Sequence, residues 1–137
     1  MNFPLTIDAS VFISAFTPSE QAHEASKAFM HKVRETNVSI LVPTLLIPEI
    51  AAAIGRGQGK PDLGYAFAIE VSCYSNVTLI SLDENLAEMA AEIAARYRLR
   101  GSDAVYAAVA RRFAATLVTL DTEQLERLQP VVPARMP

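Results

Sequence analysis

The sequence predicts an α/β protein of three layers, with a central, mostly parallel sheet of four to five strands between two layers of helices. Short apolar segments alternate along the chain with longer segments whose apolar residues recur at helical spacing. Strands that are almost wholly apolar are typical of a parallel sheet covered on both faces. The composition, 51% hydrophobic and 20% charged, is that of a globular protein. We expect one domain over residues 1–137, with its core at about 3–129 and a short tail at 130–137.

The N-terminal part of the chain predicts a strand followed by a helix. Residues 3–7 form a short apolar run that ends at Asp8. A helix is expected to begin after Thr17, because Thr17 as N-cap and Glu20 three residues later form a capping-box pattern. Apolar residues at helical spacing continue this helix to Val33.

The second strand and helix place an acid near a helix start. Residues 38–42 predict a buried strand and residues 43–56 a helix. Pro48 would break the interior of that helix, so we expect it in the first turn, which places Glu49 near the helix N-terminus. The glycine-rich segment 55–61 predicts a loop, whose two cations either meet a phosphate or only belong to a flexible connection.

The rest of the chain continues the alternation. The expected elements are a helix at 62–75, a strand at 77–81, a helix at 83–99, a helix at 102–115, a strand at 116–120 and a helix at 121–128. Ser102 is the expected N-cap of the helix that contains Asp103, and Asp121 is the expected N-cap of the last helix.

Four acidic residues follow strands or begin helices. Asp8 and Asp121 directly follow the first and last strands, and Glu49 and Asp103 lie in the first turns of helices. In parallel sheets, ligands bind beyond the carboxyl ends of the strands. Each acid alone could simply favour a helix N-terminus, but four carboxylates at one edge repel one another unless a cation joins them. Oxygen ligands without histidine or cysteine select a hard ion, Mg²⁺ or Mn²⁺.

The remaining metal-binding and targeting features are few. His23 and His31 lie on the first helix away from this edge, where we expect a solvated surface. Cys73 alone can form neither an internal disulfide nor a cysteine-built zinc site, and we expect it in the core. Asp8 interrupts the first apolar run well short of the ~20 residues that a membrane span needs. We expect a cytoplasmic protein without a membrane partner.

Four strings of residues carry a family resemblance. IDASVFI, PEIAAAIGR, GSDAVYAAVA and LVTLD occur in this order over nearly the whole chain and together resemble a PIN domain. The size of the chain and the stretches LLIPEIAAAIGR and SDAVYAAVA are similar to VapC-type toxins of type II toxin–antitoxin pairs. Residue by residue, the four acids of the family fall on Asp8, Glu49, Asp103 and Asp121. Ser10 and Thr119 match polar positions that often support the site.

The resemblance implies an activity and partners. Members of the family are endoribonucleases that depend on Mg²⁺ or Mn²⁺, in which the bound ion activates water and neutralises charge on the phosphate. Asp8 and Asp103 would be the main ligands, with Glu49 in direct or water-mediated contact. Asp121 would act through water, or only with a second ion and the RNA present. The implied partners are an RNA substrate, a cognate antitoxin and a second copy of the chain in a homodimer.

Cations near the acids are expected to bind the RNA backbone. The net charge is −3, but between Arg96 and Arg112 the chain holds five arginines and one acid, Asp103. From this basic patch we expect Arg98 and Arg100 to contact RNA. Two cations of the loop at 55–61 are added to them as expected RNA-binding residues, Arg56 and Lys60.

Two other functions have to be weighed. A phosphoacceptor signalling domain normally needs an acidic pair after its first strand and a lysine after a late one. Here TIDASV holds one acid and LVTLDTE no lysine. The second alternative is a PIN-fold protein that only scaffolds a complex or serves RNA processing, and the complete set of four acids argues against the scaffold.

Overall fold

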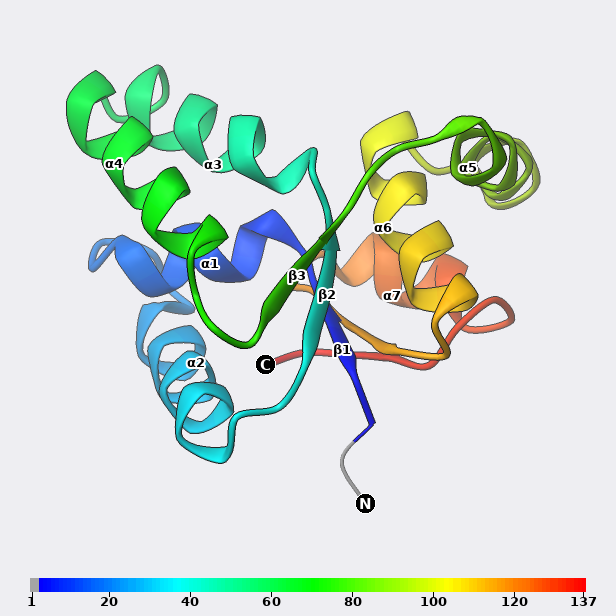
Figure 1. Cartoon of the computed structure of the whole chain (residues 1–137), viewed down its shortest axis with the longest axis horizontal. Helices are drawn as coiled ribbons and strands as arrows, with labels where there is room; N and C mark the ends of the chain where they lie inside the picture. The colour runs from blue at the N-terminus through cyan, green and yellow to red at the C-terminus, as the bar shows by residue number, and fades with distance from the viewer. Residues whose placement is uncertain (1–2) are drawn as a thin grey trace.

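The computed structural model describes residues 3–137 and contains a five-stranded sheet with the strand order β3-β2-β1-β4-β5 (Figure 1). The strands are β1 (Leu5–Ile7), β2 (Ile40–Pro43), β3 (Val77–Ile80), β4 (Thr116–Val118) and β5 (Ala134–Arg135). The helices are α1 (Ala9–Phe16), α2 (His23–Thr36), α3 (Leu46–Gly55), α4 (Pro61–Ser72), α5 (Glu84–Tyr97), α6 (Gly101–Arg112) and α7 (Thr122–Leu128). Helices α1 to α4 lie on one side of the sheet in Figure 1 and α5 to α7 on the other, which confirms the predicted three-layer α/β class.

The strands of the sheet are all parallel, with β1 at the centre. Leu5 of β1 pairs with Ile40 of β2 on one side and with Thr116 of β4 on the other. Parallel strands bring their carboxyl ends to one edge of the sheet. Helices α1, α3 and α7 begin just beyond that edge, so the residues that start them gather in one region.

Helix α6 forms the most buried part of the core. All residues from Asp103 to Ala110 are buried, because α6 packs against β1, β2 and β4 on one side and α5 on the other. Alanine at four of these positions lets the helix backbone approach the sheet closely. Among residues 3–137, none of the helices has the length and apolar character that crossing a membrane requires.

The start of the first helix differs from the prediction. Helix α1 begins directly after Asp8, and Thr17 is its C-cap. Helix α2 begins only at His23, so the predicted capping box is wrong. The amide of Glu20 donates to the carbonyl of Thr17 over 3.1 Å, and the Thr17 hydroxyl accepts from Gln58 Nε2 over 2.8 Å. The same residue types therefore form a turn between two helices.

Other local expectations also change. Ser102 is the second residue of α6 and not its cap; the N-cap is Arg100, which makes no side-chain capping bond. His23 is buried, with Nδ1 2.8 Å from the carbonyl oxygen of Ser14, whereas Cys73 is exposed. The segment 130–137, expected as a tail, contributes the edge strand β5, which pairs with β4.

Candidate active site

The four predicted acids lie at the carboxyl edge of the sheet. Asp8 follows β1, Asp121 is the N-cap of α7, and Glu49 and Asp103 are in the first turns of α3 and α6. Asp8 and Asp103 are only 7% and 8% exposed. The charges of Asp8 and Asp103 act on Glu49, and those of Asp8 and Asp121 act on Asp103. The fold thus brings together acids that are far apart in the sequence.

Asp8 is held by two hydroxyl groups rather than by a helix end. Although Asp8 is the N-cap of α1, its carboxylate makes no capping bond. Instead Ser10 Oγ donates to Asp8 Oδ2 over 2.7 Å and Thr119 Oγ1 donates to the same oxygen over 3.1 Å. The two hydroxyls also accept bonds from the amides of Leu120 and Asp121. Both side-chain contacts are to Oδ2, which leaves Oδ1 for a ligand.

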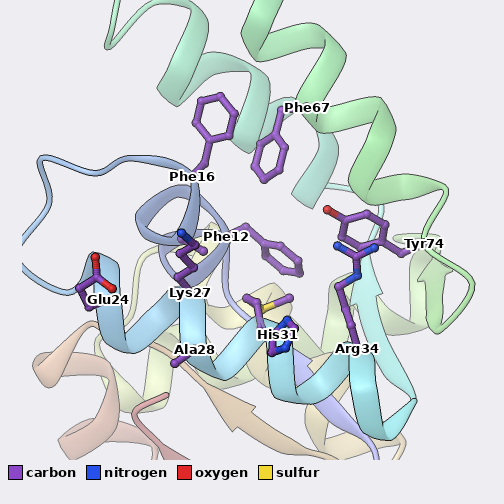
Figure 2. Close-up of a pocket in the computed structure, with 11 residues that line it drawn as sticks. Phe12, Phe16, Glu24, Lys27, Ala28, His31, Arg34, Phe67 and Tyr74 are labelled. Carbon is purple, nitrogen blue, oxygen red and sulfur yellow. The ribbon is translucent and has the colours of Figure 1, made fainter.

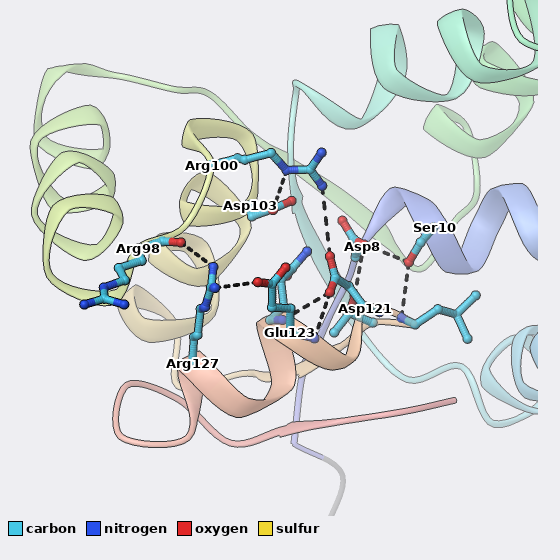
Figure 3. A network of polar contacts seen from close by, with 11 residues as sticks. Asp8, Ser10, Arg98, Arg100, Asp103, Asp121, Glu123 and Arg127 are labelled. Carbon is cyan, nitrogen blue, oxygen red and sulfur yellow. Dashed lines mark hydrogen bonds and ion pairs between the residues drawn. The ribbon is translucent and has the colours of Figure 1, made fainter.

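Asp121 combines two roles. Its Oδ1 accepts from the amides of Glu123 and Gln124 over 2.9 and 3.2 Å, which confirms the predicted cap. Its Oδ2 lies 4.0 Å from a terminal nitrogen of Arg100 (Figure 3). The cap thus uses one oxygen and leaves the other facing the site.

Asp103 is buried beside a cation. Arg100 Nε lies 3.2 Å from Asp103 Oδ2, so one guanidinium contacts both Asp103 and Asp121 (Figure 3). Burial raises the pKa of the Asp103 carboxyl, although the contact with Arg100 opposes this rise. The Asp103 carboxylate is thus buried away from water, and the guanidinium of Arg100 compensates its charge.

Glu49 is held by a tyrosine. The hydroxyl of Tyr106, on α6, donates to Glu49 Oε1 over 2.6 Å. Burial raises the pKa of the Glu49 carboxyl; the bond from Tyr106 opposes the rise, and the charges of Asp8 and Asp103 add to it. Glu49 therefore takes up a proton at a higher pH than a glutamate in water does.

The donor set fits a hard divalent cation. Its ligands would be carboxylate oxygens. Repulsion from neighbouring carboxylates helps to raise the pKa values of Glu49 and Asp103, and a bound cation would relieve this repulsion. As the side chains stand, no three Asp, Glu, His or Cys residues within 3–137 are close enough together to hold an ion. Arg100 spans two of the acids, so its guanidinium would have to move aside for an ion to contact both Asp103 and Asp121.

Comparison with known proteins identifies the family. The family model of the PIN domain matches residues 5–129, most of the chain. The chain belongs to the PIN domain family. In a comparison with curated protein sequences, none is similar enough to this PIN domain to count as a match.

Solved structures share the fold of this PIN domain. VapC20 of Mycobacterium tuberculosis, a sarcin–ricin-loop-cleaving toxin, aligns with a TM-score of 0.74 and 16% identity over 89% of this chain and 93% of that chain. VapBC2 of Rickettsia felis, bound to a promoter DNA fragment, aligns with a TM-score of 0.73 and 13% identity over 98% of each chain. DNA-bound VapBC of Salmonella typhimurium gives 0.72 and 13%, again over 98% of each. Identities this low establish the shared fold alone.

The basic residues predicted to bind RNA lie in two separate places. Arg98 and Arg100 line a hollow of about 300 Å³ together with Asp103 and Asp121. Arg56 is the C-cap of α3 and Lys60 the N-cap of α4. Lys60 lines a different hollow, beside the turn after α1. The structure thus places Arg98 and Arg100, but not the loop cations, at the hollow that Asp103 and Asp121 line.

Two residues at the site were not predicted. Arg127 also lines the hollow; it donates to the carbonyl of Arg98 over 2.7 Å and forms an ion pair with Glu123 (Figure 3). It lies in the last turn of α7, where a basic residue is ordinary. The sequence could have indicated Tyr106, because it is three residues after Asp103 and therefore lies on the same face of the helix.

Proposed function

We propose that this PIN domain is a divalent-metal-dependent endoribonuclease, the toxin of a VapBC-type pair, which hydrolyses RNA phosphodiester bonds with metal-activated water. The observation that carries the proposal is the set of four carboxylates at one sheet edge. Asp8 and Asp103 are buried, and Asp8 and Glu49 accept bonds from hydroxyl groups. The likeness in fold to VapC20, a toxin that cleaves the sarcin–ricin loop, supports it. The cytoplasm is the proposed location.

The residues that would hold Mg²⁺ or Mn²⁺ have distinct duties. Asp8 and Asp103 would be the main ligands, and Glu49 and Asp121 would add oxygens directly or through water. Such an ion lowers the pKa of bound water to near neutrality and stabilises charge on the phosphate. Ser10 and Thr119 donate to Asp8, and we assign to their hydroxyls the role of orienting this carboxylate.

The hollow beside the acids suits an RNA backbone. Arg98, Arg100 and Arg127 are among the residues that line it. Arginine binds phosphate through paired N–H donors. We infer that a phosphate next to the scissile one contacts this wall, whereas Arg56 and Lys60 would reach only more distant parts of the RNA.

An apolar groove on another face suits the antitoxin. Helices α1, α2 and α4 line a groove of about 540 Å³ (Figure 2). Phe16 and Phe67 stack there with ring centroids 4.4 Å apart, and Phe12 and Tyr74 extend the apolar wall. Charged residues at the rim, among them Lys27 and Arg34, would select an amphipathic segment with acidic groups.

The activity is tested with labelled RNA that contains a loop. Cleavage should require Mn²⁺ or Mg²⁺ and stop when EDTA is added. Asp8→Asn and Asp103→Asn should each lower the rate at least ~100-fold while keeping the fold, and Glu92→Gln on the exposed face of α5 is the control. Undiminished cleavage by both variants would refute the assignment. Failure to bind Mn²⁺ would favour a scaffold, and phosphate incorporation from a small donor would favour a signalling domain.

A further inference from the structure

Tyr106 connects the core of the protein to one acid of the site. Its side chain is fully buried and is among the largest such side chains in the protein. The hydroxyl reaches from α6 to Glu49 Oε1 on α3, 57 positions away in the sequence, over 2.6 Å. Asp103 lies one helical turn before Tyr106 on the same face of α6. One helix thus supplies an acid of the site and the donor that holds another.

The bond from Tyr106 to Glu49 does more than give a buried hydroxyl a partner, because the hydroxyl is held as a donor. Burial first, and then the charge of Glu49, raise the pKa of Tyr106 far above its ordinary value, so the hydroxyl keeps its proton. It therefore acts as a donor to the carboxylate.

Glu49 needs such a restraint. A glutamate side chain has three rotatable bonds, and this one is only partly buried, so water competes for its carboxylate. The Tyr106 ring is itself held by the core on all sides and cannot follow the carboxylate outward. Fixing Oε1 leaves Oε2 as the oxygen for a ligand.

We propose that Tyr106 is a positioning residue that holds Glu49 as a metal ligand by donating its hydroxyl to Oε1. The inference rests on the proposed function, because it assigns Glu49 to the metal. Partners of metal-ligating side chains typically contribute about 10- to 100-fold to metal affinity. We expect the lower end of this range, because Glu49 is one of four ligands.

Calorimetry with Mn²⁺ tests the proposal on the wild type, Tyr106→Phe, Glu49→Gln and the double variant. Tyr106→Phe keeps the ring and removes only the donor, so Mn²⁺ affinity should fall about tenfold. In the Glu49→Gln background, the same change should have no further effect. Tyr97→Phe, at the end of α5 and outside the site, should leave the affinity unchanged. Circular dichroism checks that each variant is folded.

The outcomes separate this inference from the proposed function. If the wild type fails to bind Mn²⁺, the proposed function and this inference are both rejected. If it binds, and Tyr106→Phe has no effect or the same effect in both backgrounds, only this inference is rejected. Should Tyr106→Phe not fold, Glu49→Asp shortens the acid by one methylene and draws it away from the hydroxyl. Its Mn²⁺ affinity should then also fall about tenfold, and unchanged affinity would overturn the inference.

Discussion

Burial of Asp103 affects how the stability of the metal-free protein depends on pH. Its folded-state pKa is raised above 3.8, so the folded state binds more protons than the unfolded state between the two values. The free energy of unfolding therefore falls as pH rises through this window and stays reduced above it. In EDTA at pH 7.5, Asp103→Asn should melt at the same temperature as wild type or higher, and its advantage should shrink toward pH 4.

Asp83 provides a control of opposite sign. It caps α5 with a bond to the amide of Leu86, and this bond lowers its pKa below 3.8. Its stabilisation is therefore present at neutral pH and is lost as pH falls, so Asp83→Asn should melt below wild type at pH 7.5. If Asp103→Asn behaves in the same way as Asp83→Asn, the Arg100 contact outweighs burial at Asp103.

Arg100 contacts carboxylates that are also proposed metal ligands. Its guanidinium contacts Asp103 and Asp121 and is largely exposed. Arg100→Ala should weaken RNA binding several-fold and reduce the slope of log affinity against log salt by about 1. The same variant should bind Mn²⁺ more tightly, because no guanidinium competes for the acids. Arg96→Ala, which removes only an exposed pair with Glu92, should change neither titration. Weaker Mn²⁺ binding by Arg100→Ala would show that Arg100 supports the ion.

At the scale of elements, α3 and α4 pack through a glycine. A Cβ placed on Gly64 would lie 2.7 Å from the amide nitrogen of Gly55 and 2.9 Å from the carbonyl oxygen of Ala51. Both are backbone atoms, so the helices would have to separate. We expect Gly64→Ala to lower the free energy of unfolding by about 1–3 kcal/mol, measured by urea denaturation. Gly101→Ala is the matched control, because a Cβ there meets no atom within 4 Å. Equal stability of the two variants would contradict the tight packing.

The sequence predicted most elements, and the failures have physical causes. The apolar runs at 38–42 and 116–120 contain strands that are mostly buried, and the run at 77–81 contains β3, which is only partly buried. Helix α1 is as apolar as a strand and follows one, so no change of pattern separates the two. Strand β5 has two residues, of which Arg135 is exposed, and only its pairing with β4 defines it.

Acids were easier to predict than their partners. Asp8 and Asp121 follow predicted strands and Glu49 and Asp103 lie at predicted helix starts, so local patterns were enough to single out the four carboxylates. The Tyr106 contact joins α6 to α3, and the Arg127 contact joins α7 to the turn before α6. Such contacts depend on the angles between helices, which a local pattern does not encode.

For the whole molecule, the exposed face of α4 is the proposed homodimer surface. Tyr65 and Ile69 are 67% and 38% exposed and lie one helical turn apart. With Leu63, which is 46% exposed on the same helix, they are the apolar surface that we propose a second copy covers. Light scattering at micromolar concentration should give the mass of a dimer, and the double variant Tyr65→Glu, Ile69→Glu should give that of a monomer. Leu82→Glu, at an apolar residue outside α4 that is 46% exposed, should remain dimeric. A monomeric wild type would refute the proposal.

The bond between Thr119 and Asp8 has a consequence for synthesis of the protein. It joins residues 111 positions apart, and β4 must pair beside β1 before it can form. On the ribosome, a nascent chain can present Asp8 early but cannot fix its carboxylate until residues 116–121 have left the exit tunnel. Under the proposed function, the site therefore stays incomplete until β4 has been synthesised and has paired with β1.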